Sequence, residues 1–207
     1  VCGSGYTESY VNDNTADAIV NTFEGGVFTK ALGAGANITL HGGMRWGVVG
    51  NVTNNFVKGN YYRFFGGCDY GRVLETATNN FGKELTEGEE APVLTFSNYV
   101  LGGGNDMVDV DAKIAAAKAK EEADRTDTQK AWIAFEEKYG EGFDIGTEYI
   151  VNNIYYGNFH QFYGGPYGSN TETIHSGINT ITNNIKGGTF DADPSAYVAD
   201  GYDAVAL

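Results

Sequence analysis

Residues 52–67 read VTNNFVKGNYYRFFGG and residues 150–165 read IVNNIYYGNFHQFYGG, so the two stretches align without a gap. A third copy begins at Ile19, and a fourth runs from Ile181 to Phe190. A degraded fifth copy spans Ala77–Leu85. The first asparagines of successive copies lie 33, 25, 73 and 31 residues apart. Repeats of roughly 20–50 residues are typical of stacked architectures such as solenoids and propellers.

The pattern inside each copy favours a β-solenoid. Apolar residues and the first asparagine occupy alternate positions, as in Val52, Asn54 and Phe56, which is the period of a strand with one buried face. Glycines follow at fixed offsets, where the chain turns or another backbone comes close. A propeller blade would need roughly 40–45 residues and four strands. We therefore predict an all-β dominated fold, a single-stranded parallel β-helix that forms one domain over residues 1–207.

The first asparagine of each copy has the same parity as the apolar positions, so we predict that it points inward. A buried amide needs hydrogen-bond partners, and stacked asparagines can bond to one another along the stacking direction. This interpretation assigns a structural ladder to Asn21, Asn54, Asn79, Asn152 and Asn183. The opposite parity gives an outer face lined by threonine and asparagine. That face resembles those of ice-binding β-solenoids, so ice binding is one alternative function.

Residues 107–140 interrupt the repeats with a helical sequence. Its first half is rich in strong helix formers and contains no glycine or proline. Thr126 and Gln129 have the spacing of a capping box, which predicts the start of a second helix. The apolar stripe around Ile114 and Ile133 is thin, so we expect this helical hairpin to lie against the flank of the β-helix. It either caps and staples the solenoid or forms an arm that contacts a partner.

Composition limits the classes of partner. The chain has 207 residues, 30 glycines and a formal net charge of −14. This charge argues against nucleic acids and anionic membrane surfaces, because both attract clusters of Lys and Arg. The chain has no apolar run long enough to span a bilayer, so we expect no direct membrane insertion. The sequence looks like an excerpt from a longer protein, and neighbouring modules are then further partners.

The two cysteines, Cys2 and Cys68, leave two possibilities open. They either form a disulfide that pins the N-terminal segment to the second repeat or remain separate thiols, because sequence alone does not give their Cα separation. The three histidines share no metal-ligand spacing. The acidic run at residues 105–111 lacks the glycine and the terminal glutamate of a calcium loop. We therefore predict no metal site and no cofactor.

Patterns that would indicate catalysis are weak. Parallel β-helices include polysaccharide lyases and hydrolases, which need clustered carboxylates, often with a basic residue on the same face. The acidic run at residues 105–111 lies where a helix should begin, so Asp109 or Asp111 is better explained as an N-cap. The chain has no Gly-x-Ser-x-Gly elbow and no phosphate loop. We predict no catalytic residue and no enzyme; a polysaccharide-active β-helix enzyme is the less favoured alternative.

Aromatic residues are abundant, with 14 Tyr, 12 Phe and 2 Trp, and many of them cluster after Gly59 and Gly157. Exposed Tyr and Arg are enriched at binding hot spots, and Tyr rings also stack on sugars. The residues of these clusters that the core column does not fix are candidates for partner binding: Tyr62, Arg63, Tyr155, Tyr156, His160, Tyr163 and Tyr167. These side chains either bind a partner or only cover corners of the fold and pack against the helical insertion.

The C-terminal segment carries a family resemblance. Residues 185–202 contain Gly-Gly-Thr-Phe, Asp-Pro-Ser-Ala-Tyr and Ala-Asp-Gly-Tyr in that order. This order resembles the module end of large repetitive surface proteins of gut Firmicutes, and the Phe-Phe-Gly-Gly and Phe-Tyr-Gly-Gly stretches resemble their Gly-rich repeats. The resemblance covers most of the chain except the helical insertion. It implies an extracellular modular protein displayed on the cell wall, and it carries over no catalytic residue.

We therefore expect a non-enzymatic adhesin module that is secreted or displayed on a bacterial cell surface. Its expected partner is a host macromolecule, either a glycan or a protein such as a glycoprotein or an immunoglobulin. The alternative is a structural spacer or stalk segment of a large surface protein.

Overall fold

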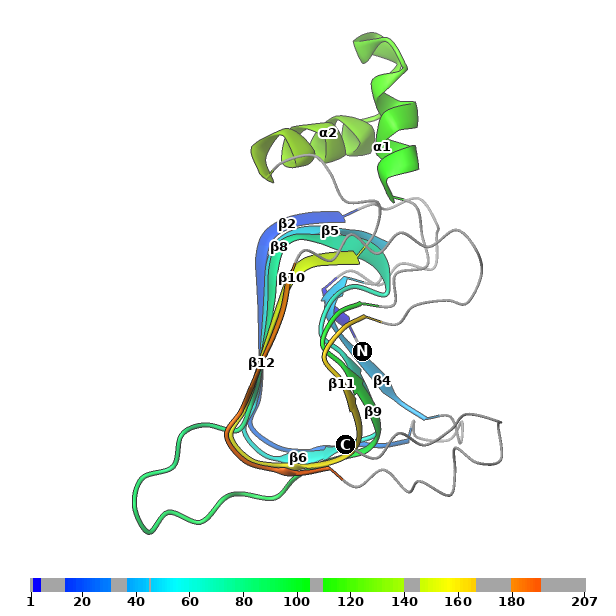
Figure 1. The fold of residues 1–207 in the computed structure, drawn as a ribbon. Helices are drawn as coiled ribbons and strands as arrows, with labels where there is room; N and C mark the ends of the chain where they lie inside the picture. Colours follow the sequence, from blue (N-terminus) through cyan, green and yellow to red (C-terminus); the bar gives the residue numbers. More distant parts are fainter. Residues whose placement is uncertain are drawn as a thin grey trace, which may run out of the picture.

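The computed structural model describes residues 2–4, 14–30, 37–44, 46–104, 110–139, 146–166 and 180–190. In these ranges the chain is dominated by β-strands, which form two sheets in which every strand pair is parallel. The predicted strand-dominated fold with parallel sheets is therefore confirmed. Figure 1 shows the long strands along one side and the shorter strands along the base and the opposite side.

The first sheet contains five long strands, and each carries one copy of the repeat. They are β2 (Asn14–Phe23), β5 (Trp46–Phe56), β8 (Tyr70–Phe81), β10 (Gly146–Ile154) and β12 (Thr180–Ile185). Their order in the sheet is β12-β10-β8-β5-β2. The register pairs the first asparagine of each copy with that of the next, so all five stand in one row. The degraded copy in β8 therefore occupies a normal place in the sheet.

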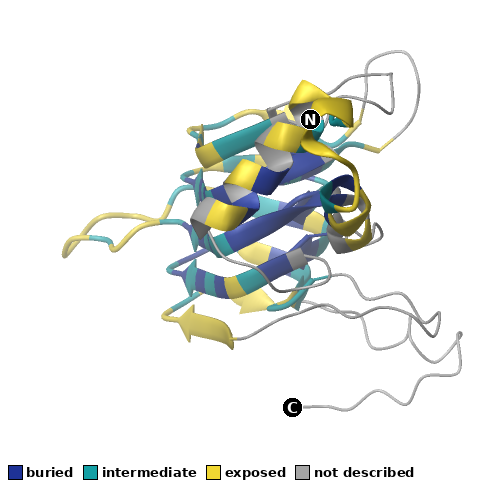
Figure 2. Cartoon of the chain, turned by 90° about the horizontal axis from the view of Figure 1, so that it is seen from above, coloured by how far each residue is buried: buried dark blue, intermediate teal, exposed yellow. Residues whose placement is uncertain are grey.

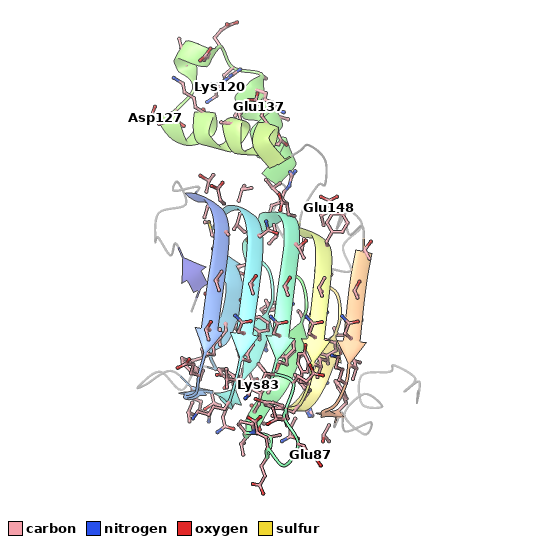
Figure 3. The ribbon with its side chains drawn as sticks, turned by 90° about the vertical axis from the view of Figure 1, so that its left-hand side faces the viewer. Lys83, Glu87, Lys120, Asp127, Glu137 and Glu148 are labelled. Atoms are coloured by element: carbon pink, nitrogen blue, oxygen red, sulfur yellow. The ribbon has the colours of Figure 1, made fainter. Side chains whose placement is uncertain are left out.

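The second sheet contains shorter strands. They are β1 (Cys2–Ser4), β3 (Val27–Phe28), β4 (Thr39–Met44), β6 (Gly59–Tyr61), β7 (Arg63–Phe65), β9 (Leu94–Leu101), β11 (Asn158–Tyr163) and β13 (Thr189–Phe190). The main path is β1-β4-β7-β9-β11-β13, while β6 pairs with both β3 and β9. Strand β9 follows the degraded copy after a projecting loop over residues 82–93, which lies below the sheets in Figures 1 and 3.

Stacked aromatic rings fill the space between the two sheets. One column consists of Phe23, Phe56 and Phe81, with centroid separations of 4.6 and 5.5 Å. The second column consists of Phe28, Tyr61, Phe96, Phe159 and Phe190, with neighbouring centroids 5.1 to 5.5 Å apart. The two columns meet edge to face, as at Phe56 and Tyr61, whose ring planes cross at 80°. Full burial of such a side chain stabilises the fold by about 1.5–3 kcal/mol.

Tyr61 is the polar member of the second column. Its side chain is fully buried, and its hydroxyl donates a hydrogen bond to the Lys58 carbonyl oxygen at 2.8 Å. Burial raises the pKa of Tyr61 to about 12. Because the ordinary tyrosine pKa is about 10, the neutral phenol stabilises the fold fully below pH 10, and this contribution is lost as the pH rises towards 12.

We expect Tyr61→Phe to remove this pH dependence. Between pH 8 and pH 11.5 the wild-type protein should lose about 2 kcal/mol more unfolding free energy than the Tyr61→Phe variant. Urea titrations of both proteins at the two pH values measure the difference. Equal losses in the two proteins would show that Tyr61 ionises in the folded state without cost.

The helical insertion consists of α1 (Val110–Lys118), a 3-10 turn η1 (Glu122–Asp124) and α2 (Asp127–Tyr139). The capping box predicted for the second helix is present. The Gln129 N–H donates to Thr126 Oγ1 at 3.2 Å, and the Thr126 N–H donates to Gln129 Oε1 at 3.1 Å. Figure 1 places both helices at the end of the first sheet where β2, β5 and β8 begin.

Two kinds of contact fix the insertion on the flank of the first sheet. The apolar contact involves Ile114, Ala117 and Ile133 of the helices with Val48 of β5 and Leu74 of β8. The polar contact is a buried carboxylate between two cations. Glu136 Oε1 lies 3.8 Å from Arg72 Nη1, and Glu136 Oε2 lies 2.8 Å from Lys118 Nζ. Because one carboxylate contacts a cation from β8 and one from α1, this group sets the position in which the helices dock.

Candidate functional site

The first asparagines of the repeats form a continuous ladder inside the fold. Nδ2 of Asn21, Asn54, Asn79 and Asn152 each donates to Oδ1 of the next asparagine, at 2.8 Å in every case. The same Nδ2 atoms also donate to the carbonyl oxygens of Gly42, Gly66, Gly102 and Gly164, at 2.7 to 3.0 Å. A carbonyl oxygen only accepts, so the amide nitrogen must face it, and the direction of the ladder is fixed. The ladder ties the two sheets together, and the amides of its inner members Asn54, Asn79 and Asn152 are occupied by hydrogen bonds within the fold.

Paired glycines of the repeat make room for this ladder. A Cβ at Gly66 would fall on the carbonyl oxygen of Gly102 and within 2.5 Å of Asn79 Nδ2. Similar conflicts surround Gly42, Gly102 and Gly164. The two sheets are therefore in contact at the level of the asparagine ladder, because the glycines of the second sheet place no side chain between them. This contact explains why an asparagine and a glycine recur together in each copy.

The second asparagines form an outer row that runs in the opposite direction. Asn184 donates to Asn153, Asn153 to Asn80, and Asn80 to Asn55, at 2.8 to 2.9 Å. Asn55 then donates to Thr22 Oγ1 at 3.4 Å. These side chains lie on the outer face of the first sheet, where they are half-buried or exposed. The amides of this face therefore bond mainly to one another.

Two of the predicted binding residues meet on the outer face of the second sheet. The Arg63 guanidinium carbon lies 5.5 Å from the centroid of the Tyr62 ring and 4.2 Å from that of Tyr99. Arg63 Nε donates to Asn98 Oδ1 at 3.2 Å. We call Tyr62, Arg63, Asn98 and Tyr99 the Arg63 cluster; all four are half-buried. Asn98 and Tyr99 were not predicted, because β9 follows the loop over residues 82–93 and matches no copy of the repeat.

The polar and aromatic face continues on both sides of the Arg63 cluster. Gln161 of β11 pairs with Tyr99 in the sheet register, and Tyr163, two residues further on, is 45% exposed. On the other side, the Phe65 ring lies 5.9 Å from Tyr99 and stacks on His41 at 4.9 Å. The accessible face therefore extends from the Arg63 cluster towards β11, while the buried Phe65 ring connects the cluster to His41 of β4.

The other predicted binding residues lie elsewhere or differ in exposure. His160 is half-buried at the register shift between Phe159 and Gln161. Tyr155 is half-buried in the turn after β10, with Lys186 Nζ 4.9 Å from its ring centroid. Tyr167 lies outside the described residues.

Tyr156 is buried, which agrees with the alternative that these side chains only cover corners of the fold. Only 6% of this residue is exposed, and its hydroxyl donates to the Val57 carbonyl oxygen at 2.9 Å. Its ring lies against Gly82, which has a positive φ of 79° and no side chain to block the ring. Burial raises the pKa of Tyr156. Tyr156 has the parity of the buried Asn152 and Ile154, but the matching residue of the 52–67 copy, Lys58, is exposed, so comparison of the copies did not indicate that Tyr156 is buried.

Cysteine and histidine do not combine into a reactive centre in the part of the chain that the structure describes. Cys68 is buried; its sulfur accepts a hydrogen bond from the Met44 N–H, and its thiol donates to the Arg72 carbonyl oxygen. The side chain of Cys2 lies outside the described residues, so the two alternatives, a disulfide with Cys68 and separate thiols, are not tested. Among the described side chains, no group of three or more His, Cys, Asp or Glu is placed to hold a metal ion.

No protein-family model, curated protein or solved structure matches this chain. Within the described residues, neither helix is long and apolar enough to cross a membrane. The function is therefore inferred from the residues and their geometry.

Proposed function

We propose that this chain is a β-solenoid module of a bacterial cell-surface protein and that it binds a host glycan or glycoprotein without catalysing a reaction. Two features support the solenoid: five repeat copies in register and an asparagine ladder that joins the two sheets. The resemblance of residues 185–202 to the module ends of gut surface proteins supports the extracellular location.

The Arg63 cluster is the observation that carries the binding function. Arg63 lies against two tyrosine rings, its Nε is bonded to an amide oxygen, and no carboxylate among the described residues forms an ion pair with it. Tyrosine rings stack on sugar rings, and a guanidinium binds a carboxylate through paired hydrogen bonds. The arrangement therefore fits a glycan that carries an acidic sugar.

We expect Arg63→Ala and Tyr99→Ala each to weaken glycan binding by at least about tenfold, because a binding hot spot contributes about 2 kcal/mol or more. A glycan array that includes uronate-containing and sialylated chains identifies the ligand, and calorimetry measures the dissociation constants. Tyr155→Ala is the matched control, since that half-buried tyrosine also contacts a cation but at the corner after β10. Circular dichroism checks that all three variants remain folded.

The same experiments separate this function from its rivals. No binding on the array, together with no capture of protein from mucus or serum, would favour a structural spacer. Capture of immunoglobulin that does not depend on its glycans would show that the module recognises a protein surface and not a glycan. Incubation with pectins and mucin glycans should yield no new reducing ends or unsaturated products, and their appearance would indicate an enzyme.

A further inference from the structure

In the part of the chain that the structure describes, the first sheet ends in an edge strand on each side. Among the described residues, β2 pairs only with β5 and β12 pairs only with β10, and Figure 3 shows these two strands at opposite edges of the sheet. Every residue of β12 is exposed, whereas the central strands are largely buried (Figure 2). An edge strand presents unpaired N–H and C=O groups that can pair with another strand.

The inner asparagine ladder ends in complementary groups at these two edges. Each amide nitrogen donates to the next copy towards the C-terminus, from Asn21 through to Asn183. At the β12 edge, Asn183 Nδ2 is thus a donor with no acceptor among the described residues. At the β2 edge, Asn21 Oδ1 is an acceptor with no donor among them. One more step of the same ladder would join Asn183 of one molecule to Asn21 of another.

The outer row also ends in complementary groups, but its acceptor lies at the β12 edge and its donor at the β2 edge. Asn184 donates to Asn153, and its Oδ1 at the β12 edge accepts no hydrogen bond from the described residues. Thr22 Oγ1 accepts from Asn55, which leaves its hydroxyl proton to donate at the β2 edge. When the two edges meet in parallel register, both rows are therefore satisfied at once.

The apolar columns are complementary as well. At one end of the stack, Ile181, Ile185 and Phe190 are 39%, 55% and 45% exposed. At the other end, Phe23 and Phe28 are half-buried members of the same columns. The register of the repeat would place Ile185 on Phe23 and Phe190 on Phe28, which buries apolar surface from both ends.

We propose that copies of this chain stack head to tail, with β12 of one copy pairing in parallel with β2 of the next and β13 with β3. Such an interface uses two different surfaces, so a dimer keeps one unused edge at each end and the stack can continue beyond a dimer. The charge of −14 on each copy opposes stacking. Because salt shortens the screening length from about 30 Å at 0.01 M to about 3 Å at 1 M, association should strengthen with ionic strength.

Sedimentation of the full chain at rising concentration, in 0.05 M and 1 M NaCl, tests the proposal. The average mass should rise with concentration past that of a dimer, and more steeply at 1 M NaCl. A protein that stays monomeric up to about 0.5 mM in 1 M NaCl, or that stops at a dimer, would overturn head-to-tail stacking.

The variant Asn183→Asp distinguishes association through the ladder hydrogen bond from nonspecific association. A carboxylate still accepts the hydrogen bond from Asn152, but it has no proton to donate to Asn21 of the next copy. We expect the association constant to fall by at least about tenfold while the unfolding midpoint stays unchanged. Asn60→Asp is the matched control, because Asn60 is exposed in the interior strand β6 and gains the same charge. Equal weakening by both variants would overturn the role of the ladder.

Engineered disulfides test the register. Val20 and Thr182 occupy the same outer column of the sheet, so they would face each other across the interface. A mixture of Val20→Cys and Thr182→Cys proteins should yield a 20–182 disulfide, which peptide mass spectrometry identifies. Dimers that form just as readily from Thr182→Cys alone would indicate β12 against β12 and would overturn the proposal.

Discussion

Asn79→Ala is expected to lower the free energy of unfolding by about 3–6 kcal/mol, which is a large part of the 5–15 kcal/mol typical of a domain. Asn79 is fully buried at the centre of the inner ladder. Its truncation removes the acceptor of Asn54, the donor to Asn152 and the donor to the Gly102 carbonyl oxygen. Each buried polar group left without a partner costs about 1–3 kcal/mol, and a small cavity adds to the loss.

Asn80→Ala is the matched control for that experiment. Asn80 is the next residue in the same strand and also bonds to asparagines on both sides, but it belongs to the outer row. Water can replace its lost hydrogen bonds, so we expect a change within about 1 kcal/mol. Urea unfolding followed by circular dichroism measures both variants. Equal losses at positions 79 and 80 would contradict a structural role that depends on burial.

Gly66→Ala is expected to cost at least about 3 kcal/mol and to lower the yield of folded protein strongly. The added Cβ would collide with the Gly102 carbonyl oxygen and with the amide of Asn79. One obstacle is backbone and the other is held by the ladder, so neither can move without breaking hydrogen bonds between the sheets.

Gly165→Ala provides the comparison. The nearest atom to a Cβ at Gly165 is Ile181 Cδ1 at 3.1 Å, the end of a side chain that is 39% exposed. That side chain can move, so we expect a change within about 1 kcal/mol. Soluble yield and thermal unfolding by circular dichroism measure both variants. A Gly66→Ala protein as stable as Gly165→Ala would show that the sheets can separate at this height.

These expectations assign a structural role to the Asn-Asn and Gly-Gly elements of the repeat. Function is then sought where the copies differ. Arg63 lies in the 52–67 copy, and the matching position of the 150–165 copy is occupied by Gln161. The cation of the Arg63 cluster is therefore not a repeated feature. The helical insertion also occurs once, but its buried contacts to β5 and β8 give it a structural explanation of its own.

The sequence by itself predicted the strand register and the inward direction of the first asparagines. Copies of one repeat pair best when like residues lie side by side, and alternation within a strand decides which residues share a face. The start of α2 was predictable for a similar reason, because a capping box consists of two side chains and two backbone groups within four residues. In each case the information is local or is repeated along the chain.

The tertiary structure alone decided the features that depend on turns and on an irregular insertion. Tyr156 is buried although the matching residue of the 52–67 copy, Lys58, is exposed, because Tyr156 occupies the space beside Gly82. The Arg63 cluster joins β7 to β9 across the loop over residues 82–93, and no repeat spacing connects Arg63 to Tyr99. The second hydrogen bond of each ladder asparagine likewise depends on how closely the two sheets approach. Such contacts are set by the path of the chain between strands, which the strand pattern does not encode.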